Sequence, residues 1–354
     1  MIHVYIDPSA YVHLNNELFG KDPNYNRNDA LLVWRYLKEY CLEKNISVQT
    51  IDFWPARRQG GNLTAATSDD IYVSFDHKIL LRKWYWKLKS KKYPKVNLSR
   101  FSRKILFQFE PPNVMPEIRF IMGNRFIADR VLRVYDKVFF SWKVVNPKIR
   151  DFLFPQVRDG IFTDLWEKKN RRFLTLINTN RKTLLRHKEL LTERVKAIIF
   201  FSKTGDIDLY GFDWESPPLF PYWFSKNAIT KVYKGSVDSK HEKLSEYTFT
   251  LAFENCELPG YITEKFFDCL YVGTIPIYLG APDIAEYVPS SCFIDMRSFK
   301  NYKELSTYLK SLRKEQIQEY KEQGRRFLES EQYKPFTKEH FADVFVKACL
   351  RNTK

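Results

Sequence analysis

The apolar and polar positions of the chain form two series in which short strands alternate with helices. In the first series, compact apolar runs bounded by polar residues predict strands, and a helical apolar repeat predicts a helix. The strands are expected at Ile2–Ile6, Ser47–Ile51, Ile71–Phe75, Lys104–Phe109 and Lys137–Trp142, and the helix at Asp29–Lys44 with Asn28 or Asp29 as its cap. Pro111 and Pro112 stop the fourth strand abruptly, because proline has no N–H group for a sheet.

The second series begins at Phe173 and repeats the alternation. Its strands are expected at Phe173–Asn178, Asp206–Tyr210, Tyr247–Phe253 and Thr274–Leu279. Its helices are expected at Lys182–Lys203, Thr263–Val272, Tyr302–Arg313, Lys314–Glu329 and Lys338–Leu350. Gly211 and Gly280 directly follow two of the strands and mark their ends.

This alternation predicts an α/β fold in which parallel sheets carry helices on both faces. Because 354 residues exceed one ordinary domain, the two series predict two doubly wound domains. We expect the first at 1–166, the second at 167–330, and a C-terminal helical segment at 331–354 that packs back on the first domain. Ligands bind outside the carboxyl ends of the strands in such sheets, so the cleft between two facing domains is the expected site.

One strand-to-helix junction in the second series is rich in polar residues. Phe249–Gly280 reads FTLAFENCELPGYITEKFFDCLYVGTIPIYLG, and Thr263 is the expected N-cap of its helix. A helix N-terminus presents N–H groups and partial positive charge to an anion. Lys265 would add a full charge, and Glu264 offers two acceptor oxygens to a diol such as ribose. An ordinary capped helix with an exposed Glu–Lys pair fits the same residues.

The stretch FENCELPGYITEK followed by GTIPIYLG resembles the donor-binding signature of the α1,3-fucosyltransferases, which form glycosyltransferase family 10. Upstream, Glu193–Lys196 and Asp206–Gly211 are similar to the family's arginine-bearing helix and to the strand after it. The resemblance implies a bacterial-type soluble member with a GT-B fold, in which two Rossmann-like domains face each other across a cleft. Cys256 departs from the pattern, because family members usually have Ser or Thr there.

The resemblance also implies roles for single residues. Arg194 matches the arginine that contacts the nucleotide diphosphate, Lys265 the lysine that neutralises it, and Glu264 the carboxylate on the ribose. The implied donor-binding residues together are Arg194, Asn255, Tyr261, Thr263, Glu264 and Lys265. Taken without the resemblance, Arg194 is better explained as a surface cation near the middle of a long helix.

Glu110 is the candidate catalytic base. It follows the predicted strand Lys104–Phe109 and precedes two prolines, which resembles the place of the family's catalytic glutamate in the acceptor-side domain. The Glu-Ser-Pro tripeptide of many members is absent. A buried carboxylate at such a strand end can have a raised pKa and accept a proton. A carboxylate on the rim of the site, without a catalytic part, fits the same position.

The resemblance implies an inverting, metal-independent transferase that moves L-fucose from GDP-fucose to a hydroxyl of a glycan acceptor. The expected linkage is α1,3 to N-acetylglucosamine of a surface glycan, such as a lipid-linked lipopolysaccharide precursor or a glycoprotein chain. The alternatives are a GT-B enzyme with another nucleotide-sugar donor, an inactive lectin-like relative, and a basic nucleic-acid-binding protein.

The charge of the chain is concentrated in one segment. The net charge is +16, and Lys78–Lys104 holds eleven Lys or Arg and no acidic residue, interleaved with aromatic residues such as Trp84 and Trp86. Such a segment suits an anionic membrane surface, a nucleic acid, or an ordinary solvated face. We favour the membrane, and we expect no nucleic-acid partner.

Metal and redox chemistry find little support in the sequence. The five cysteines and six histidines show no zinc spacing, no glycine-rich phosphate loop is present, and Asp206-Ile207-Asp208 opens a strand instead of forming a metal site. We therefore expect no cofactor and no bound metal. Met1–Ile6 is too short for a signal peptide, and no apolar run could span a bilayer. The expected location is the cytoplasm, peripheral to the inner membrane surface.

Overall fold

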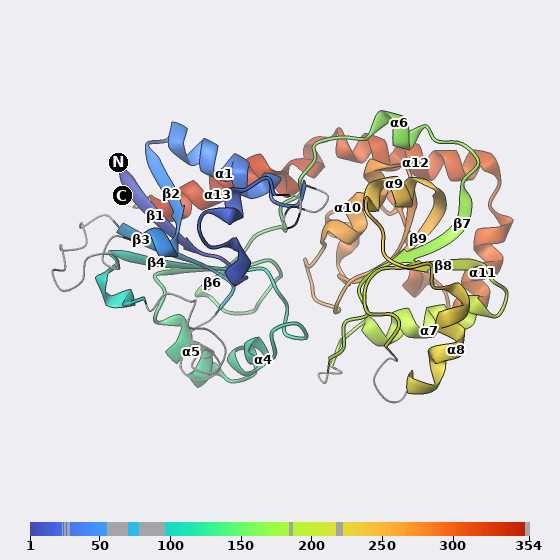
Figure 1. The fold of residues 1–354 in the computed structure, drawn as a ribbon, viewed down its shortest axis with the longest axis horizontal. Coiled ribbons are helices and arrows are strands. Elements are labelled where there is room, and N and C mark those ends of the chain that lie inside the picture. Colours follow the sequence, from blue (N-terminus) through green and yellow to red (C-terminus); the bar gives the residue numbers. More distant parts are fainter. Residues whose placement is uncertain are drawn as a thin grey trace. The chain divides into compact units, whose positions relative to one another are not determined.

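The computed structural model describes residues 1–22, 24, 26, 29–54, 70–77, 96–183, 187–216 and 222–350. They fall into two compact units, the first from Met1–Val157 and Phe336–Lys354 and the second from Arg158–Pro335 (Figure 1). The boundaries expected after residues 166 and 330 therefore lie inside the second unit. The first boundary lies before Phe162 and not after residue 166, because the N–H of Phe162 donates to the carbonyl of Tyr271 in the second unit at 2.8 Å. The second boundary lies after Tyr333 and not after residue 330, because the hydroxyls of Tyr333 and Tyr271 lie 2.7 Å apart within the second unit.

The described residues of the first unit form a six-stranded sheet in the order β2-β1-β3-β4-β5-β6, and every pairing is parallel. The strands are β1 (Ile2–Asp7), β2 (Ile46–Thr50), β3 (Asp70–Phe75), β4 (Arg103–Gln108), β5 (Lys137–Phe140) and β6 (Ile149–Asp151). All six residues of β3 and the last four of β4 are buried, because helices cover both faces of these central strands.

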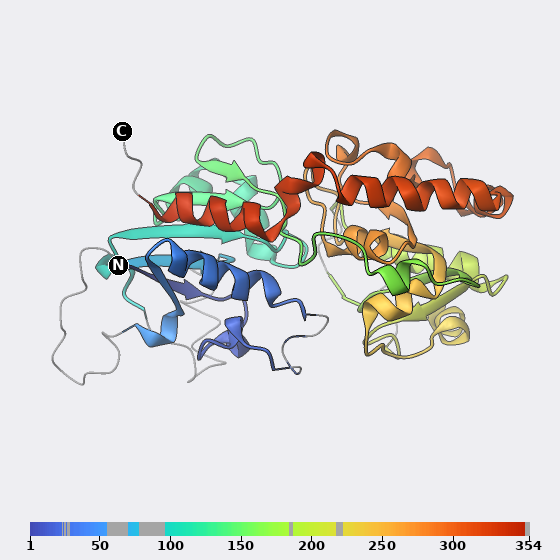
Figure 2. The same cartoon turned by 90° about the horizontal axis from the view of Figure 1, so that it is seen from above.

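Helices from both ends of the chain cover one face of this sheet. α1 (Leu32–Glu43) and α13 (Lys338–Cys349) pack together there, and α4 (Pro116–Gly123) and α5 (Arg125–Leu132) lie on the other face (Figures 1 and 2). The ring of Phe341 on α13 lies 5.5 Å from that of Phe107 on β4, and the ring of Phe345 lies 5.6 Å from it. The C-terminal helix therefore completes the core of the first unit.

The second unit contains a five-stranded parallel sheet in the order β11-β10-β9-β7-β8. The strands are β7 (Arg172–Ile177), β8 (Ile207–Tyr210), β9 (Tyr247–Phe253), β10 (Ile275–Leu279) and β11 (Ile294–Asp295). One face carries α6 (Thr163–Trp166), α9 (Lys240–Ser245), α10 (Glu264–Tyr271) and α12 (Lys314–Leu328), and the other α7 (Leu191–Ser202), α8 (Lys226–Val232) and α11 (Tyr302–Ser311) (Figure 1). The predicted α/β class with two parallel sheets is confirmed.

The largest error in the expected elements is the start of α7. The apolar pattern predicts a helix from Lys182, but the helix begins at Leu191. The N–H of Leu190 donates to the carbonyl of Asn255 at 3.1 Å, and the N–H of Glu257 donates to the carbonyl of Lys188 at 2.7 Å. These residues pair with the turn after β9 and are not available to a helix. Arg194 consequently lies in the first turn of α7 and not near its middle.

Smaller differences follow from element length and from chain ends. β6 and β11 have three and two residues, which is too short for a periodic signal, and α4 and α5 were not predicted. α1 begins at Leu32, while Asp29 has a left-handed backbone and pairs with Arg35; Asn28 lies outside the described residues. Within the described part of the chain, no helix is both long enough and apolar enough to cross a bilayer.

Candidate functional site

The centre of the second sheet is where a ligand is expected. The chain passes from β7 to β8 on one side and later returns to place β9 on the other side of β7, so the strand order reverses between β7 and β9. Ligands of doubly wound sheets bind outside the carboxyl ends of the strands at this reversal. The turn that follows β9 runs from Glu254 to Thr263, where α10 begins. Five of the six predicted donor-binding residues lie in or directly after this turn.

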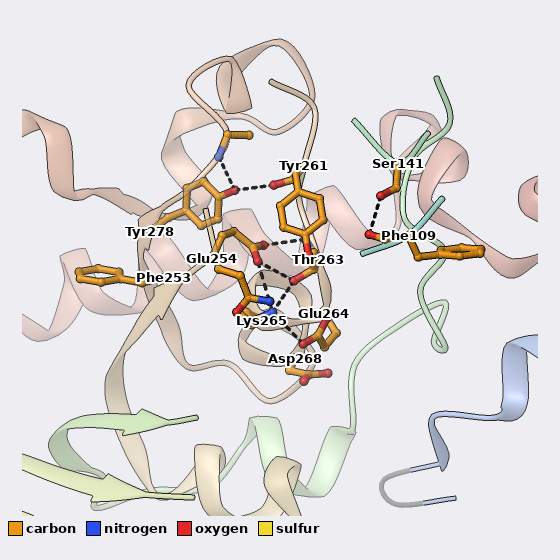
Figure 3. A network of polar contacts seen from close by, with 12 residues as sticks. Phe109, Ser141, Phe253, Glu254, Tyr261, Thr263, Glu264, Lys265, Asp268 and Tyr278 are labelled. Atoms are coloured by element: carbon orange, nitrogen blue, oxygen red, sulfur yellow. Dashed lines mark hydrogen bonds and ion pairs between the residues drawn. The ribbon is translucent and has the colours of Figure 1, made fainter. Parts of the chain in front are cut away.

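Glu254 organises the turn, and the sequence reasoning did not select it. Its side chain is fully buried. One carboxylate oxygen accepts the backbone N–H of Thr263 at 2.7 Å, and the other accepts the Thr263 hydroxyl at 2.8 Å (Figure 3). Burial raises the pKa of the Glu254 carboxyl above its ordinary value, while the nearby Lys265 ammonium opposes the shift. A carboxylate directly after the apolar run Leu251–Phe253 at the end of β9 was the sequence signal for a buried charge.

Thr263 is the N-cap of α10 as predicted, but its side chain does not cap the helix. Its hydroxyl instead donates to Glu254, and its backbone N–H also binds that carboxylate. The Glu254 carboxylate therefore already accepts the backbone N–H of Thr263 at the positive end of the helix.

Lys265 lies between two carboxylates. Its ammonium nitrogen is 3.4 Å from Glu254 Oε2, 3.1 Å from Glu264 Oε1 and 3.0 Å from Thr263 Oγ1 (Figure 3). The Lys265 side chain is 11% exposed, whereas that of Glu264 is 47% exposed. Partial burial disfavours ionisation of Glu264, but Lys265 and Lys240 outweigh it and hold the pKa of that carboxyl below its ordinary value. Glu264 is therefore an ionised and accessible hydrogen-bond acceptor. It lies beside the Lys265 ammonium, which is also paired with Glu254.

Arg194 and Asn255 form a second part of the site. Arg194 is 2% exposed, and its guanidinium donates from Nη2 to the carbonyl of Phe253 at 2.6 Å and to Asn255 Oδ1 at 3.1 Å. Burial lowers the pKa of Arg194 to about 10, and the Glu254 carboxylate opposes the shift, so the side chain stays charged at neutral pH. These contacts hold the carboxyl end of β9. Contact of Arg194 with a diphosphate stays a prediction.

Tyr261 completes the predicted set and is held by its neighbours. It is buried, and its carbonyl accepts the hydroxyl of Tyr278 at 3.3 Å (Figure 3). The same hydroxyl accepts the N–H of Ala281 at 2.9 Å, and the N–H of Gly260 donates to Asp283 Oδ1 at 2.7 Å. Side chains from β10 and the loop after it thus fix the conformation of the turn.

A buried ion pair continues from Glu264 along the same face of α10. Asp268 lies one helical turn after Glu264, and its oxygens lie 2.6 Å from Lys240 Nζ and 2.9 Å from His241 Nε2. Burial opposes ionisation of Asp268, but Lys240 and His241 prevail and hold the pKa of its carboxyl well below its ordinary value. Lys240 also acts electrostatically on Glu264. The sequence reasoning missed Lys240 because it lies on α9, far from the motif.

Glu110 belongs to the first unit, two residues after the end of β4. Its backbone N–H donates to Asp76 Oδ1 at 2.9 Å, and its carbonyl accepts the side-chain amide of Gln108 at 2.8 Å. Its position at the carboxyl end of a central strand is as predicted. Its role as a base stays a prediction.

The Asp-x-Asp triplet, which could suggest a metal site, is paired with cations of the protein. Asp208 is paired with Arg172, and Asp206 lies 2.7 Å from Lys310, so both carboxylates of the Asp-x-Asp triplet face cations. Within the described residues, no group of three or more His, Cys, Asp or Glu is arranged to hold a metal ion. Residues 78–95 of the basic segment lie outside the described residues.

Comparison with known proteins places the second unit in a family. The family model "Glycosyltransferase family 10 (fucosyltransferase) C-term" matches residues 169–351. Over 77 residues the chain is 43% identical to the alpha-(1,3)-fucosyltransferase FucT of Helicobacter pylori, which is 22% of this chain and 16% of that protein. Over 75 residues it is 44% identical to GDP-fucose protein O-fucosyltransferase 3 of Xenopus tropicalis, which is 21% of this chain and 16% of that protein. Each alignment thus spans only 16% of the relative's own length.

Solved structures extend the likeness of fold to nearly the whole chain. An alpha1,3-fucosyltransferase with GDP superposes with a TM-score of 0.52 at 14% identity, over 99% of this chain and 91% of that one. A sucrose-phosphate synthase from Thermosynechococcus elongatus reaches 0.56 at 10% identity, over 98% of both chains. These neighbours confirm the predicted GT-B fold of two Rossmann-like units. Since the family model covers more than half of the sequence, the chain belongs to glycosyltransferase family 10, the fucosyltransferase family.

Proposed function

We propose that this chain transfers L-fucose from GDP-fucose to a hydroxyl group of a glycan acceptor, with inversion at the anomeric carbon. The observation that supports it most is the turn after β9, where Asn255, Tyr261, Glu264 and Lys265 gather at the strand reversal of the family-10 unit. The names of the relatives point to the same donor, because one solved alpha1,3-fucosyltransferase carries GDP-fucose.

The charges of the turn suit a nucleoside diphosphate sugar. The Lys265 ammonium contacts Glu254 and Glu264 at 3.4 and 3.1 Å, and a phosphate oxygen could replace the longer of these two contacts without moving the ammonium far. Glu264 has an accessible carboxylate that can accept both hydroxyls of a ribose. Arg194 adds a buried positive charge behind Asn255, which favours anion binding through the low-dielectric interior.

The transfer itself needs one proton acceptor and stabilisation of one leaving group. Glu110 takes the proton of the acceptor hydroxyl, whose oxygen attacks the anomeric carbon of fucose from the face opposite GDP. The bond from that carbon to the diphosphate oxygen breaks, and the negative charge stays on GDP, where Lys265 and Arg194 stabilise it. A β-linked donor gives an α-linked product. A positioned base contributes about 10²–10⁴-fold to the rate.

The acceptor in this proposal is N-acetylglucosamine of a surface glycan, linked α1,3 and carried on a lipid at the cytoplasmic leaflet. Lys78–Lys104 would hold the enzyme there, because anionic lipids attract basic residues by about 1 kcal/mol each near the surface. Charge reversal of Lys89, Lys91 and Lys92 should abolish co-sedimentation with anionic vesicles and spare transfer to a short soluble acceptor. A preference for duplex DNA over vesicles would support nucleic-acid binding instead.

The decisive experiment compares donors. Purified protein is incubated with GDP-fucose, GDP-mannose or UDP-galactose and an acceptor that ends in N-acetyllactosamine, and product is detected by mass spectrometry. GDP-fucose alone should give product, and a chelator should leave the rate unchanged, since no metal is expected. Lys265→Ala should lose activity, whereas Lys196→Ala, which removes a partly exposed lysine paired with Glu193 on α7, should not. Use of another donor in place of GDP-fucose would refute the proposal.

A further inference from the structure

The residue pair Phe109–Glu110 in the first unit is held by side chains through all four of its backbone hydrogen-bonding groups. Both N–H groups donate to one carboxylate oxygen of Asp76, at 2.7 Å from Phe109 and 2.9 Å from Glu110. The carbonyl of Phe109 accepts the Ser141 hydroxyl at 3.1 Å, and that of Glu110 accepts the Gln108 amide at 2.8 Å. A loop just beyond a strand usually bonds to water or to other backbone groups.

Asp76 is the centre of this arrangement. It directly follows β3, is 2% exposed, and has a left-handed backbone with φ of 62°. The same Oδ1 atom also accepts Gln108 Nε2 at 3.0 Å. A buried carboxylate is costly unless several donors point at it, and hydrogen bonds to a charged acceptor are about twice as strong as neutral ones. Asp76 therefore fixes the path of the chain beyond β4 more rigidly than a neutral side chain would.

Gln108 and Ser141 extend this set of hydrogen bonds to residues 109 and 110, called the grip below, to the ends of β4 and β5. Gln108, the last residue of β4, is fully buried, and its Oε1 accepts the backbone N–H of His77 at 2.8 Å. Ser141 directly follows β5 and is also fully buried, and its hydroxyl points to the carbonyl of Phe109 (Figure 3). Three buried polar side chains, from the ends of three adjacent strands, thus converge on two residues.

We propose that Asp76, with Gln108 and Ser141, is a positioning residue that holds Glu110 where it accepts the proton of the acceptor. The inference rests on the proposed role of Glu110. The contacts of these side chains that are described above go to the main chain of His77, Phe109 and Glu110 and to one another, so in this proposal they act through Glu110. Because a displacement of about 1 Å can cost 10²-fold in rate, loss of the grip should lower turnover and leave donor binding in the second unit unchanged.

A matched carboxylate at the opposite end of β4 serves as the control. Asp136 Oδ2 accepts the backbone N–H of Lys104 at 2.7 Å, which is the same kind of contact at the end of the strand away from Glu110. The Asp136 side chain is 49% exposed. Removing it should disturb the strand end without reaching the base.

The test measures fucosyl transfer to N-acetyllactosamine by Asp76→Gly, Asp76→Asn and Asp136→Ala. Glycine and asparagine both tolerate the left-handed backbone at this position, so the substitutions change the carboxylate without straining the backbone at residue 76. Asp76→Gly should lower kcat by roughly 10- to 100-fold with the KM for GDP-fucose nearly unchanged. Asp76→Asn should lose less, because its amide oxygen still accepts. Asp136→Ala should keep normal turnover.

A double variant separates positioning from general structural support. In the Glu110→Gln background, Asp76→Gly should cause no further loss of turnover, because residues that act as one unit are not additive. Equal losses in both backgrounds, or normal turnover in Asp76→Gly while Glu110→Gln is inactive, would overturn the inference.

Hydrogen exchange tests the grip independently of the activity. The amides of residues 109 and 110 should lose protection in Asp76→Gly and keep it in Asp136→Ala. If the wild-type protein transfers no fucose, the proposed function fails. Unchanged protection in Asp76→Gly would refute the positioning role on its own.

Discussion

Gly280, at the end of β10, is the position where the smallest change should disturb the candidate site most. A Cβ atom there would lie 2.3 Å from the Tyr278 hydroxyl oxygen and 2.5 Å from Glu254 Cγ, whereas ordinary contacts begin near 3.4 Å. Neither neighbour can move cheaply. Tyr278 is fully buried and hydrogen-bonded to Ala281 and Tyr261, and Glu254 is bound through both oxygens to Thr263.

The magnitude follows from these contacts. Overpacking a rigid interior costs about 1–3 kcal/mol, and displacing one of the hydrogen bonds around Glu254 adds about 1 kcal/mol. We therefore expect Gly280→Ala to lower the free energy of unfolding by about 2–4 kcal/mol. For a domain of this size each kcal/mol shifts Tm by about 2–4 °C, so the melting transition should fall by roughly 5–15 °C. GDP affinity should fall as well, because Glu254 pairs with Lys265 at 3.4 Å, and a displaced Glu254 would move that ammonium.

Thermal melting and calorimetric titration with GDP measure the two effects, and Gly160→Ala is the control. A Cβ atom at Gly160 meets nothing within 4 Å, so this variant should melt within about 2 °C of the wild type and bind GDP normally. Equal melting temperatures for the two variants would show that the packing around Glu254 is looser than the reasoning requires.

Three further predictions concern charged groups of the same unit. Lys265→Ala should weaken GDP binding by roughly 10- to 100-fold, the worth of one charge-assisted contact, and unchanged calorimetric affinity would contradict its placement. Arg194→Ala should weaken GDP binding similarly and also lower Tm, because the carbonyl of Phe253 loses its donor; a variant that melts normally would argue against the buried contact. Asp268→Asn should destabilise the protein by about 3–5 kcal/mol at neutral pH, since it leaves Lys240 without its carboxylate in a buried pair. The pKa of Asp268 is lowered on folding from its ordinary value of 3.8, so its stabilisation is present above that pH and lost on acidification. The difference in stability between wild type and Asp268→Asn should therefore begin to shrink below about pH 4 and keep shrinking as the pH falls toward the lower folded-state pKa, and a constant difference down to pH 2 would refute the ion pair.

Much of the fold was predictable because its signals are local. β9 was placed correctly at both ends, Tyr247–Phe253, and α12 was misplaced by one residue at its C-terminus. An apolar run or a helical repeat reports which face of an element is buried, and each needs only neighbouring residues. The start of α7 was missed for the opposite reason, since residues 188–190 pair with the turn after β9, more than sixty positions away.

The candidate site divides in the same way. The predicted donor-binding positions come from a contiguous motif, so the sequence alone was enough to group Asn255, Tyr261, Glu264 and Lys265. Lys240 and Asp76 were missed because nothing in their neighbours along the chain distinguishes them from other basic or acidic residues. Glu254 was missed although its place directly after an apolar run was a signal of burial. Their importance comes from partners on other strands and helices.

The sequence by itself determined the class of fold, the order of most strands and longer helices, and the segment that resembles the family's signature. Periodicity and motif are properties of short stretches, and they persist whatever the rest of the chain does. Only the tertiary structure decided which charged side chains are buried and which groups they bind. Glu254 binds Thr263, Arg194 binds the carbonyl at the end of β9, and Asp76 binds the main-chain N–H of Glu110. Burial and pairing depend on distances between residues far apart along the chain, and those distances exist only once the sheets and their helices have packed.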